Sequence, residues 1–177
     1  QSSGPKSFFI PREDIDKNII GTLNIINFCS KNKIKRILFA SSFVVYGKQE
    51  KNRFNEQMDL RPSSVYAMSK SYGELLLKNY AQNKGINWNI LRMFNVYGPV
   101  QDMNNLKQCM LSIYLDQALK NKKIIVKGSI NRIRDFIYID YVIDCWLLAI
   151  KKNIKNISDN VASGKYISVK YLLDNIK

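Results

Sequence analysis

Two short apolar segments constrain the fold of this chain more than any other feature of its sequence. "RILFA" occupies residues 36–40, "NWNILRMF" occupies residues 87–94, and a stretch with helical periodicity, residues 64–83, lies between them. A short apolar run of this kind indicates a strand that is covered on both faces. Two such strands joined through a helix are typical of a parallel pair. The segments therefore predict a mostly parallel sheet with helices on both faces.

The rest of the chain continues the alternation of helices and strands. Its further predicted elements, in chain order, are helices over residues 13–32 and 106–121, strands over residues 123–128 and 134–139, a helix over residues 141–152 and a last helix capped by Ser168. Strands that alternate with helices are characteristic of the α/β fold class. We therefore expect an α/β fold without internal repeats.

The absence of histidine excludes several classes of enzyme. None of the 177 residues is a histidine, which removes Ser-His-Asp and Cys-His nucleophiles together with most zinc sites. We therefore expect no metal site. Any acid–base chemistry near neutral pH has to come from a Tyr, Lys, Asp, Glu or Cys whose pKa is perturbed.

Charge and cysteine content bear on partners and location. The net charge is +14, which is compatible with nucleic-acid binding. However, the lysines are scattered and no basic run is interleaved with aromatic residues, so we expect no nucleic-acid partner. No apolar run approaches the length of a membrane span, so we expect no membrane partner. The cysteines, Cys29, Cys109 and Cys145, include no Cys-x-x-Cys pair, which favours reduced thiols in a cytoplasmic protein.

A tyrosine and a lysine stand four residues apart at the start of the helix predicted between the two strands. Tyr66 and Lys70 share one face of that helix. Ser42 and Asn95 follow the two strands, at the sheet edge where ligands of parallel sheets bind. A lysine ammonium beside a phenol lowers the pKa of the phenol, and a serine hydroxyl can hold the oxygen that loses its proton. This group would be a base for oxidising an alcohol, provided that something accepts the hydride.

Several motifs resemble one family in order and spacing. "SSFVVYG", "VYAMSK", "LRMFNVYGP" and "RIRDFIYI" resemble the extended short-chain dehydrogenase/reductases, and most closely the NAD-dependent nucleotide-sugar epimerase/dehydratase family with its UDP-glucose 4-epimerase-like members. "NIIGTLNIINFC" (residues 18–29) resembles the Asn-x-x-Gly-Thr helix of that family. The resemblance covers nearly the whole chain and implies a Rossmann-like fold with NAD as the cofactor.

The resemblance also implies roles for the residues that match the motifs. Tyr66 would be the catalytic base, and Lys70 would tune it and hold the nicotinamide ribose. Ser42 would bind the reacting hydroxyl. Phe94 would lie near the nicotinamide. Asn18 would fix the central helix beside the active site as one of the cofactor-binding residues, with a purely structural role as its alternative.

The substrate-binding residues implied by the resemblance each have an alternative. Asn95 and Arg134 would hold the diphosphate of a nucleotide-sugar, Arg134 through charge-assisted hydrogen bonds. Asn95 could instead serve a turn of its own backbone, and Arg134 could form a surface ion pair with Asp135 or Asp140. Ser42 could be a cap at the end of its strand.

The residues after Ser42 narrow the implied reaction. The family's 4,6-dehydratases have an Asp-Glu pair there and its decarboxylases keep the Glu, whereas this chain has Phe43 and Val44. Its 3,5-epimerase/reductases need a cysteine there and a distant histidine. The resemblance therefore implies a UDP-hexose 4-epimerase that works through a 4-keto intermediate. The alternatives are a nucleotide-sugar dehydrogenase or reductase and, from another class, a truncated non-catalytic binding protein.

The phosphate-binding loop of the family has no counterpart in the sequence. No Gly-rich turn follows a strand, so the family's first βαβ units are absent. We therefore expect residues 1–177 to form a single partial domain, namely the C-terminal half of the NAD-binding Rossmann domain plus the start of the substrate-binding region. We expect this fragment of a longer enzyme to be inactive alone. The resemblance also implies a homodimer that pairs helices 13–32 and 64–83.

Overall fold

The computed structural model describes residues 1–49, 53–102, 109–120 and 123–176. The chain divides into two compact units. The first unit comprises residues 1–93 with 146–160, and the second comprises residues 94–145 with 161–177.

The first unit is built on a three-stranded sheet in the order β1-β2-β5, with β1 at Arg36–Ser42, β2 at Asn87–Met93 and β5 at Ile157–Val161. β1 and β2 are parallel, in a register that places Arg36 opposite Asn87 and Ser42 opposite Met93. The prediction of two parallel strands is therefore confirmed, and β2 occupies the centre of the sheet.

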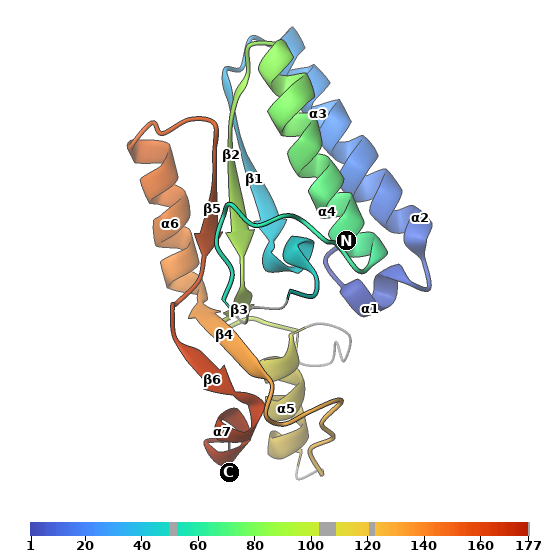
Figure 1. Cartoon of the computed structure of the whole chain (residues 1–177), viewed down its shortest axis with the longest axis vertical. Coiled ribbons are helices and arrows are strands. Elements are labelled where there is room, and N and C mark those ends of the chain that lie inside the picture. The colour runs from blue at the N-terminus through green and yellow to red at the C-terminus, as the bar shows by residue number, and fades with distance from the viewer. Residues whose placement is uncertain (50–52, 103–108, 121–122, 177) are drawn as a thin grey trace. The chain divides into compact units, whose positions relative to one another are not determined.

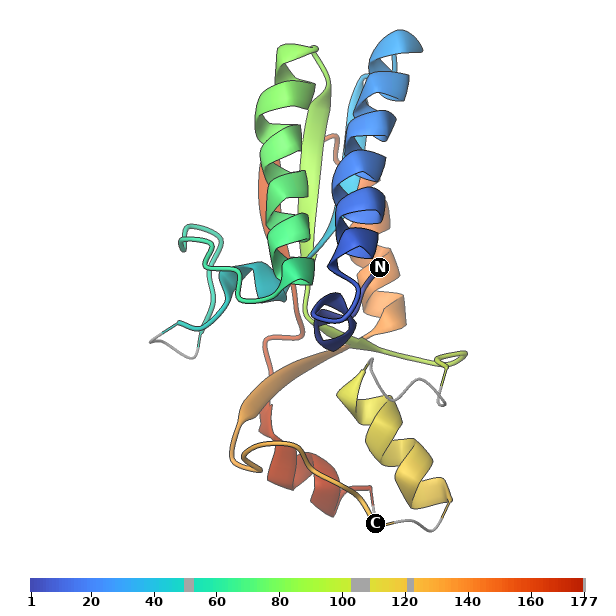
Figure 2. The ribbon, with the colours of Figure 1, turned by 90° about the vertical axis from the view of Figure 1, so that its right-hand side faces the viewer.

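Two long helical segments cover one face of this sheet side by side (Figures 1 and 2). The first consists of α2 (Pro11–Asp14), a π-helical stretch (Ile15–Ile20) and α3 (Gly21–Lys31), and it follows the short helix α1 (Gly4–Ser7). The second consists of α4 (Val65–Leu75) and a π-helical stretch (Leu76–Ala81). The end of α6 (Ile139–Lys151), from Trp146 on, lies on the other face.

The core of the first unit lies between these helices and the sheet. Its buried residues come from α3, the second helical segment, β2 and the residue just before β2: Ile26, Cys29, Leu77, Ala81, Ile86, Trp88 and Ile90. Burial of apolar side chains at this interface is the main stabilising contribution to the unit. The packing fixes α4 against β1 and so determines where the residues at the start of α4 lie.

The second unit contains a smaller sheet in the order β3-β4-β6, with β3 at Asn95–Tyr97, β4 at Ile133–Tyr138 and β6 at Tyr166–Ser168. β4 is parallel to β3 and antiparallel to β6. This unit contains α5 (Met110–Leu119) and α7 (Val169–Asp174), together with residues 139–145 of α6. As predicted, Ser168 caps α7, because its Oγ accepts a hydrogen bond from the amide of Tyr171 at 3.0 Å.

Some element predictions need correction. Residues 123–128 were expected to form a strand, but they contain no strand; instead Ile124 and Val126 pack against a core of Tyr114, Val169 and Leu172. Ile124 and Val126 are only partly buried and Ile125 is exposed, all without strand pairing, so the prediction was wrong. The helix expected over residues 106–121 is observed as Met110–Leu119, and residues 106–108 and 121 lie outside the described residues.

Neither a membrane span nor a metal cluster is found in the described ranges. None of the helices there combines the length and apolar character that crossing a membrane requires. The same residues contain no group of three or more His, Cys, Asp or Glu side chains that could hold a metal ion.

Candidate active site

The candidate site of the first unit begins where β1 ends. Ser42 is the last residue of β1, and a single 3-10 turn, Phe43–Tyr46, follows it. Gly47 ends this turn at a φ of 63°, and a Cβ there would lie 1.7 Å from the carbonyl oxygen of Arg61. Only glycine fits this position, so the chain can turn away directly after Ser42.

Helix α4 presents the tyrosine and the lysine to this strand end. Ser64 caps the helix, because its Oγ accepts a hydrogen bond from the amide of Ala67 at 3.1 Å. Tyr66 then lies in the first turn and Lys70 one turn later. The Tyr66 side chain is buried, and the Ser42 hydroxyl lies close enough to the phenol to lower its pKa. Ser42, Tyr66 and Lys70 thus come together within the first unit, as the sequence predicted.

The Lys70 ammonium lies over β1. Its Nζ donates a hydrogen bond to the carbonyl oxygen of Ala40 at 3.0 Å and lies 5.1 Å from the centroid of the Phe39 ring. The distance from Nζ to the centroid of the Tyr66 ring is 6.0 Å. An ammonium has three N–H donors, and the other two have no hydrogen-bond partner among the described residues. Lys70 is therefore equipped to donate to further acceptors.

Burial determines the direction of both pKa shifts. It raises the pKa of Tyr66, an effect that the Ser42 hydrogen bond opposes and the charge of Asp14 reinforces. It lowers the pKa of Lys70, against the attraction of Asp14. The expected lowering of the Tyr66 pKa by Lys70 is therefore wrong for this structure, because desolvation of the phenolate outweighs the other contributions.

Asn18 connects the first helical segment to α4 beside this group. Its Nδ2 lies 2.9 Å from Oγ of Ser69, 3.1 Å from the carbonyl oxygen of Gln1 and 3.3 Å from Oδ1 of Asp14. Ser69 lies between Tyr66 and Lys70 in sequence and donates its own hydroxyl proton to the Tyr66 carbonyl at 2.8 Å. Asn18 thus fixes the turn of α4 that carries the tyrosine, and its contact with a cofactor stays a prediction.

The remaining predicted site residues belong to the second unit. The Phe94 amide donates to the carbonyl of Val161 at 3.0 Å. Asn95 Nδ2 donates to the carbonyl of Asp135 at 2.7 Å, so the side chain connects β3 to β4. The structure therefore gives Asn95 a backbone partner on the neighbouring strand.

Arg134 is a half-buried cation on β4. Its Nη1 donates to the carbonyl of Ile133 at 2.7 Å. Burial lowers its pKa, and the neighbouring charge of Arg132 lowers it further. The carboxylate of Asp135 accepts hydrogen bonds from Ser163 and Gly164 instead. Among the ion pairs of the described residues, none involves Arg134.

A buried ion pair close to Ser42 was missed by the sequence analysis. It joins Glu74 of α4 to Arg92 of β2, with Arg92 Nη2 donating to Glu74 Oε2 at 2.7 Å. Two signals in the sequence could have revealed it. Glu74 follows Lys70 by four residues and so lies on the same helix face, and Arg92 interrupts the apolar segment "ILRMF".

The chain belongs to the NAD-dependent epimerase/dehydratase family, whose model matches residues 1–162. The putative UDP-glucose 4-epimerase of Methanocaldococcus jannaschii is 40% identical over 168 residues, which are 94% of this chain and 54% of the relative. The chain thus spans about half the length of the relatives that it matches. The family is NAD-dependent, so NAD is the cofactor.

Two solved structures show the same fold. The UDP-glucose 4-epimerase of Thermotoga maritima with UDP-glucose matches with a TM-score of 0.93 and 30% identity, over 100% of this chain and 57% of that one. The UDP-glucose 4-epimerase of Thermus thermophilus in complex with NAD matches with a TM-score of 0.87 and 29% identity, over 99% and 58%. A dTDP-glucose 4,6-dehydratase of Streptomyces venezuelae shares the fold alone, at 20% identity.

Proposed function

We propose that this chain is part of an NAD-dependent nucleotide-sugar 4-epimerase that acts on a UDP-hexose, with Tyr66 as the base. The observation that carries the proposal is that Ser42, at the end of β1, lies beside the buried phenol of Tyr66, with Lys70 one helical turn away. The names of the relatives support the same class of substrate. Phe43 and Val44 cannot move protons, which argues against dehydration of the sugar.

Each of the three side chains has a separate task in this reaction. Ser42 binds the C4 hydroxyl of the sugar and orients it toward Tyr66, which takes its proton and later returns it. Lys70 holds the nicotinamide ribose with the two N–H donors that lack a described partner. When bound, NAD accepts a hydride from the sugar and gives it back.

The two units divide the remaining tasks in this proposal. The first unit is the C-terminal half of the NAD-binding domain, and the second is the start of the substrate-binding region. Phe94 and Asn18 contact the cofactor, while Asn95 and Arg134 bind the diphosphate of the substrate. Support comes from Arg134, which is half-buried and has no described carboxylate partner, so it suits an anionic group.

We also propose a homodimer that pairs the two long helical segments of each copy. Large apolar side chains are exposed on both: Ile20, Ile25 and Phe28 on the first, and Met68, Tyr72 and Leu75 on the second. Exposed apolar surface of this kind marks interaction sites. A Phe28→Glu variant should be monomeric in sedimentation experiments, and a dimer that persists in this variant would argue for another interface.

Product analysis of the whole gene product tests the function. Incubated with UDP-glucose, it should form UDP-galactose without net formation of NADH; accumulation of NADH would indicate an oxidoreductase instead. Tyr66→Phe should lower kcat at least about 100-fold. The matched control is Tyr171→Phe, at an exposed tyrosine of α7, which should leave kcat unchanged.

The 177-residue chain by itself should be nearly inactive in the same assay. Its sequence contains no Gly-rich loop that could bind the pyrophosphate of NAD at a helix N-terminus. Stoichiometric binding of NAD to the isolated chain, measured by calorimetry, would contradict this expectation.

A further inference from the structure

The buried ion pair between Glu74 and Arg92 is placed directly behind the candidate active site. Glu74 is 0% exposed and Arg92 is 2% exposed. The pair is bidentate, with Arg92 Nε donating to Glu74 Oε1 at 3.0 Å and Nη2 donating to Oε2 at 2.7 Å. Such fork-to-fork contacts restrict both side chains to one geometry.

The pair holds the segment that carries Ser42 from two sides. Ser41, the residue before it, donates its hydroxyl proton to Glu74 Oε1 at 2.6 Å. Tyr46, at the end of the 3-10 turn, accepts a hydrogen bond from Arg92 Nη1 at 2.8 Å and donates to Asn160 Oδ1 at 2.8 Å. The strand end and the turn on either side of Ser42 are therefore tied to one rigid group.

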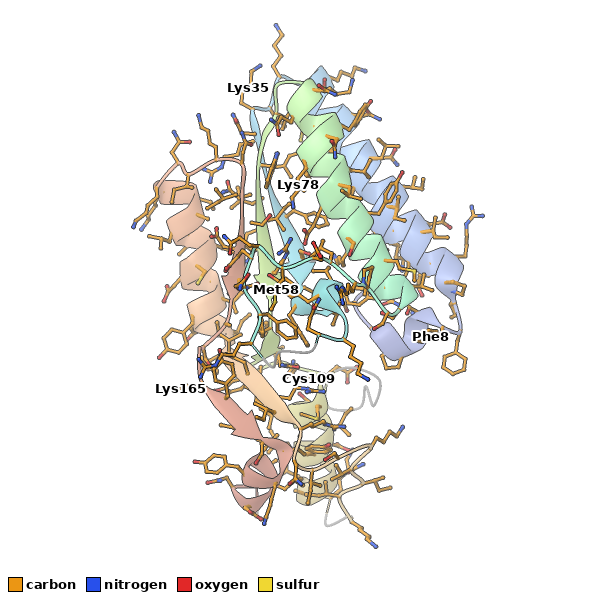
Figure 3. All side chains as sticks on the ribbon, viewed as in Figure 1. Phe8, Lys35, Met58, Lys78, Cys109 and Lys165 are labelled. Carbon is orange, nitrogen blue, oxygen red and sulfur yellow. The ribbon has the colours of Figure 1, made fainter. Side chains whose placement is uncertain are left out.

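The same group is anchored in the helix that carries the base. Glu74 lies one turn after Lys70 and two turns after Tyr66 on α4. Lys78, one turn further, reaches Glu74 with its Nζ 3.8 Å from Oε2, and Figure 3 shows it on the side of the helix that faces the strands. The helix also approaches β1 closely, since a Cβ on Gly73 would lie 2.6 Å from Cζ of Phe39.

Stability alone is a poor explanation for an ion pair in this place. Burying two charges has a desolvation cost that their attraction often only balances, and apolar pairs of similar volume can replace such ion pairs without loss of stability. What apolar side chains cannot supply is the directed bond to Ser41. The ion pair therefore fixes the distance between the end of β1 and α4, which an apolar pair would not do.

We propose that Glu74 and Arg92 are positioning residues that act through Ser41 to keep the Ser42 hydroxyl aligned with the phenol of Tyr66. The inference rests on the proposed function, because it assigns the alignment a role in catalysis by Ser42 and Tyr66. A displacement of about 1 Å between reacting groups can cost about 100-fold in rate.

The test compares an apolar replacement of the pair with the unchanged protein. The double variant Glu74→Leu, Arg92→Met keeps the volume and leaves no buried charge unpaired. In the whole gene product it should fold with a similar melting temperature, show kcat lowered about 100-fold and keep KM within about twofold. A kcat equal to that of the wild type would overturn the proposal.

A second readout needs no catalysis. Tyrosine labelled with carbon-13 at Cζ reports the titration of Tyr66 by NMR, with Tyr66→Phe identifying its signal. Because the Ser42 hydrogen bond lowers the pKa of Tyr66, its loss in the double variant should raise that pKa further. An unchanged titration would contradict the proposal. If the wild type shows no epimerase activity but the pKa of Tyr66 rises in the double variant, the proposed function is wrong, while the alignment of Ser42 with Tyr66 by the ion pair is still supported.

A pair of serine variants provides the matched control. Ser41→Ala removes one hydrogen bond to Glu74 and should lower kcat about 10-fold with the ion pair intact. Ser71→Ala removes a buried hydroxyl whose hydrogen bond, among the described residues, is to the Ala67 carbonyl of its own helix, and it should leave kcat and the Tyr66 titration unchanged. Equal effects of the two variants would show that a general loss of helix packing is responsible.

Discussion

The neighbouring strands β1 and β2 are alike in length and direction and unlike in burial. Both have seven residues and pair in parallel register. The five central residues of β2 are buried, whereas in β1 only Ser41 is. β2 has strands on both sides, while β1 pairs with β2 alone among the described residues. An apolar sequence therefore shows that a strand is suited to burial. Whether the strand is buried depends on its position in the sheet.

The difference extends to the arginine that each strand carries. Arg92 of β2 is buried and paired with a carboxylate. Arg36 of β1 is half-buried, and its guanidinium bonds to neutral oxygens, including Asn89 Oδ1 at 2.7 Å and the carbonyl of Ile154 at 2.8 Å. A cation inside the sheet requires an opposite charge, whereas a cation at its margin is sufficiently stabilised by amide and carbonyl dipoles together with water.

Replacing each arginine alone tests this contrast with the largest expected effect. Arg92→Met leaves the Glu74 carboxylate buried without its main partner and should lower the free energy of unfolding by about 3–5 kcal/mol. Arg36→Met loses only hydrogen bonds to neutral groups near solvent and should lower it by about 1–2 kcal/mol. Urea unfolding followed by circular dichroism measures both. Equal losses would show that the two strands are equivalent in their charged residues.

Isoleucine truncations test the same contrast in the apolar residues. Ile90→Ala in β2 removes a side chain that is 0% exposed and should lower the free energy of unfolding by about 3 kcal/mol, including the cavity that it leaves. Ile37→Ala in β1 removes a half-buried side chain and should lower it by less than half as much. A larger loss for Ile37 would mean that the outer edge of β1 is covered in solution, for example by association of two chains.

The smallest expected effect is the pH dependence of the lysine that lies over β1. The pKa of Lys70 is lowered from its ordinary value of 10.5 by burial. Between the lowered value and 10.5 the unfolded chain binds more protons, so stability rises with pH in this window. Lys70→Met should therefore be more stable than the wild type near neutral pH, and its advantage should shrink as the pH approaches 10.5.

Tyr66 makes the stability of the folded chain change with pH in the opposite direction. Its pKa is raised above the ordinary 10.0 by burial, so the folded chain keeps a proton that the unfolded chain loses, and stability falls as the pH rises above 10.0. Urea titrations of Lys70→Met and Tyr66→Phe across this range separate the two contributions. An advantage of Lys70→Met that grows with pH would contradict the assigned direction for Lys70.

Much of the fold could be predicted because its signals are local. The helix that begins after Ser64, the two strand segments on either side of it and the cap at Ser168 are each encoded by residues within a few positions of one another. β5 and β6 were not predicted, because short strands such as "ISDNV" contain polar residues and become strands through their neighbours. The prediction of a strand at residues 123–128 was wrong for the same reason. An apolar segment does not specify whether it will pair with a strand or pack against a helix.

The candidate site also has features with local sequence signals and features that depend on residues far apart in the chain. The meeting of Ser42, Tyr66 and Lys70 could be predicted without the structure, because helix periodicity and the strand order are enough to bring them to one edge of the sheet. Two further properties of the site depend on the packing of the folded chain: burial raises the pKa of Tyr66, and Glu74 and Arg92 form an ion pair behind Ser42. Both depend on which side chains exclude water from a given point, and that is a property of residues far apart in the chain.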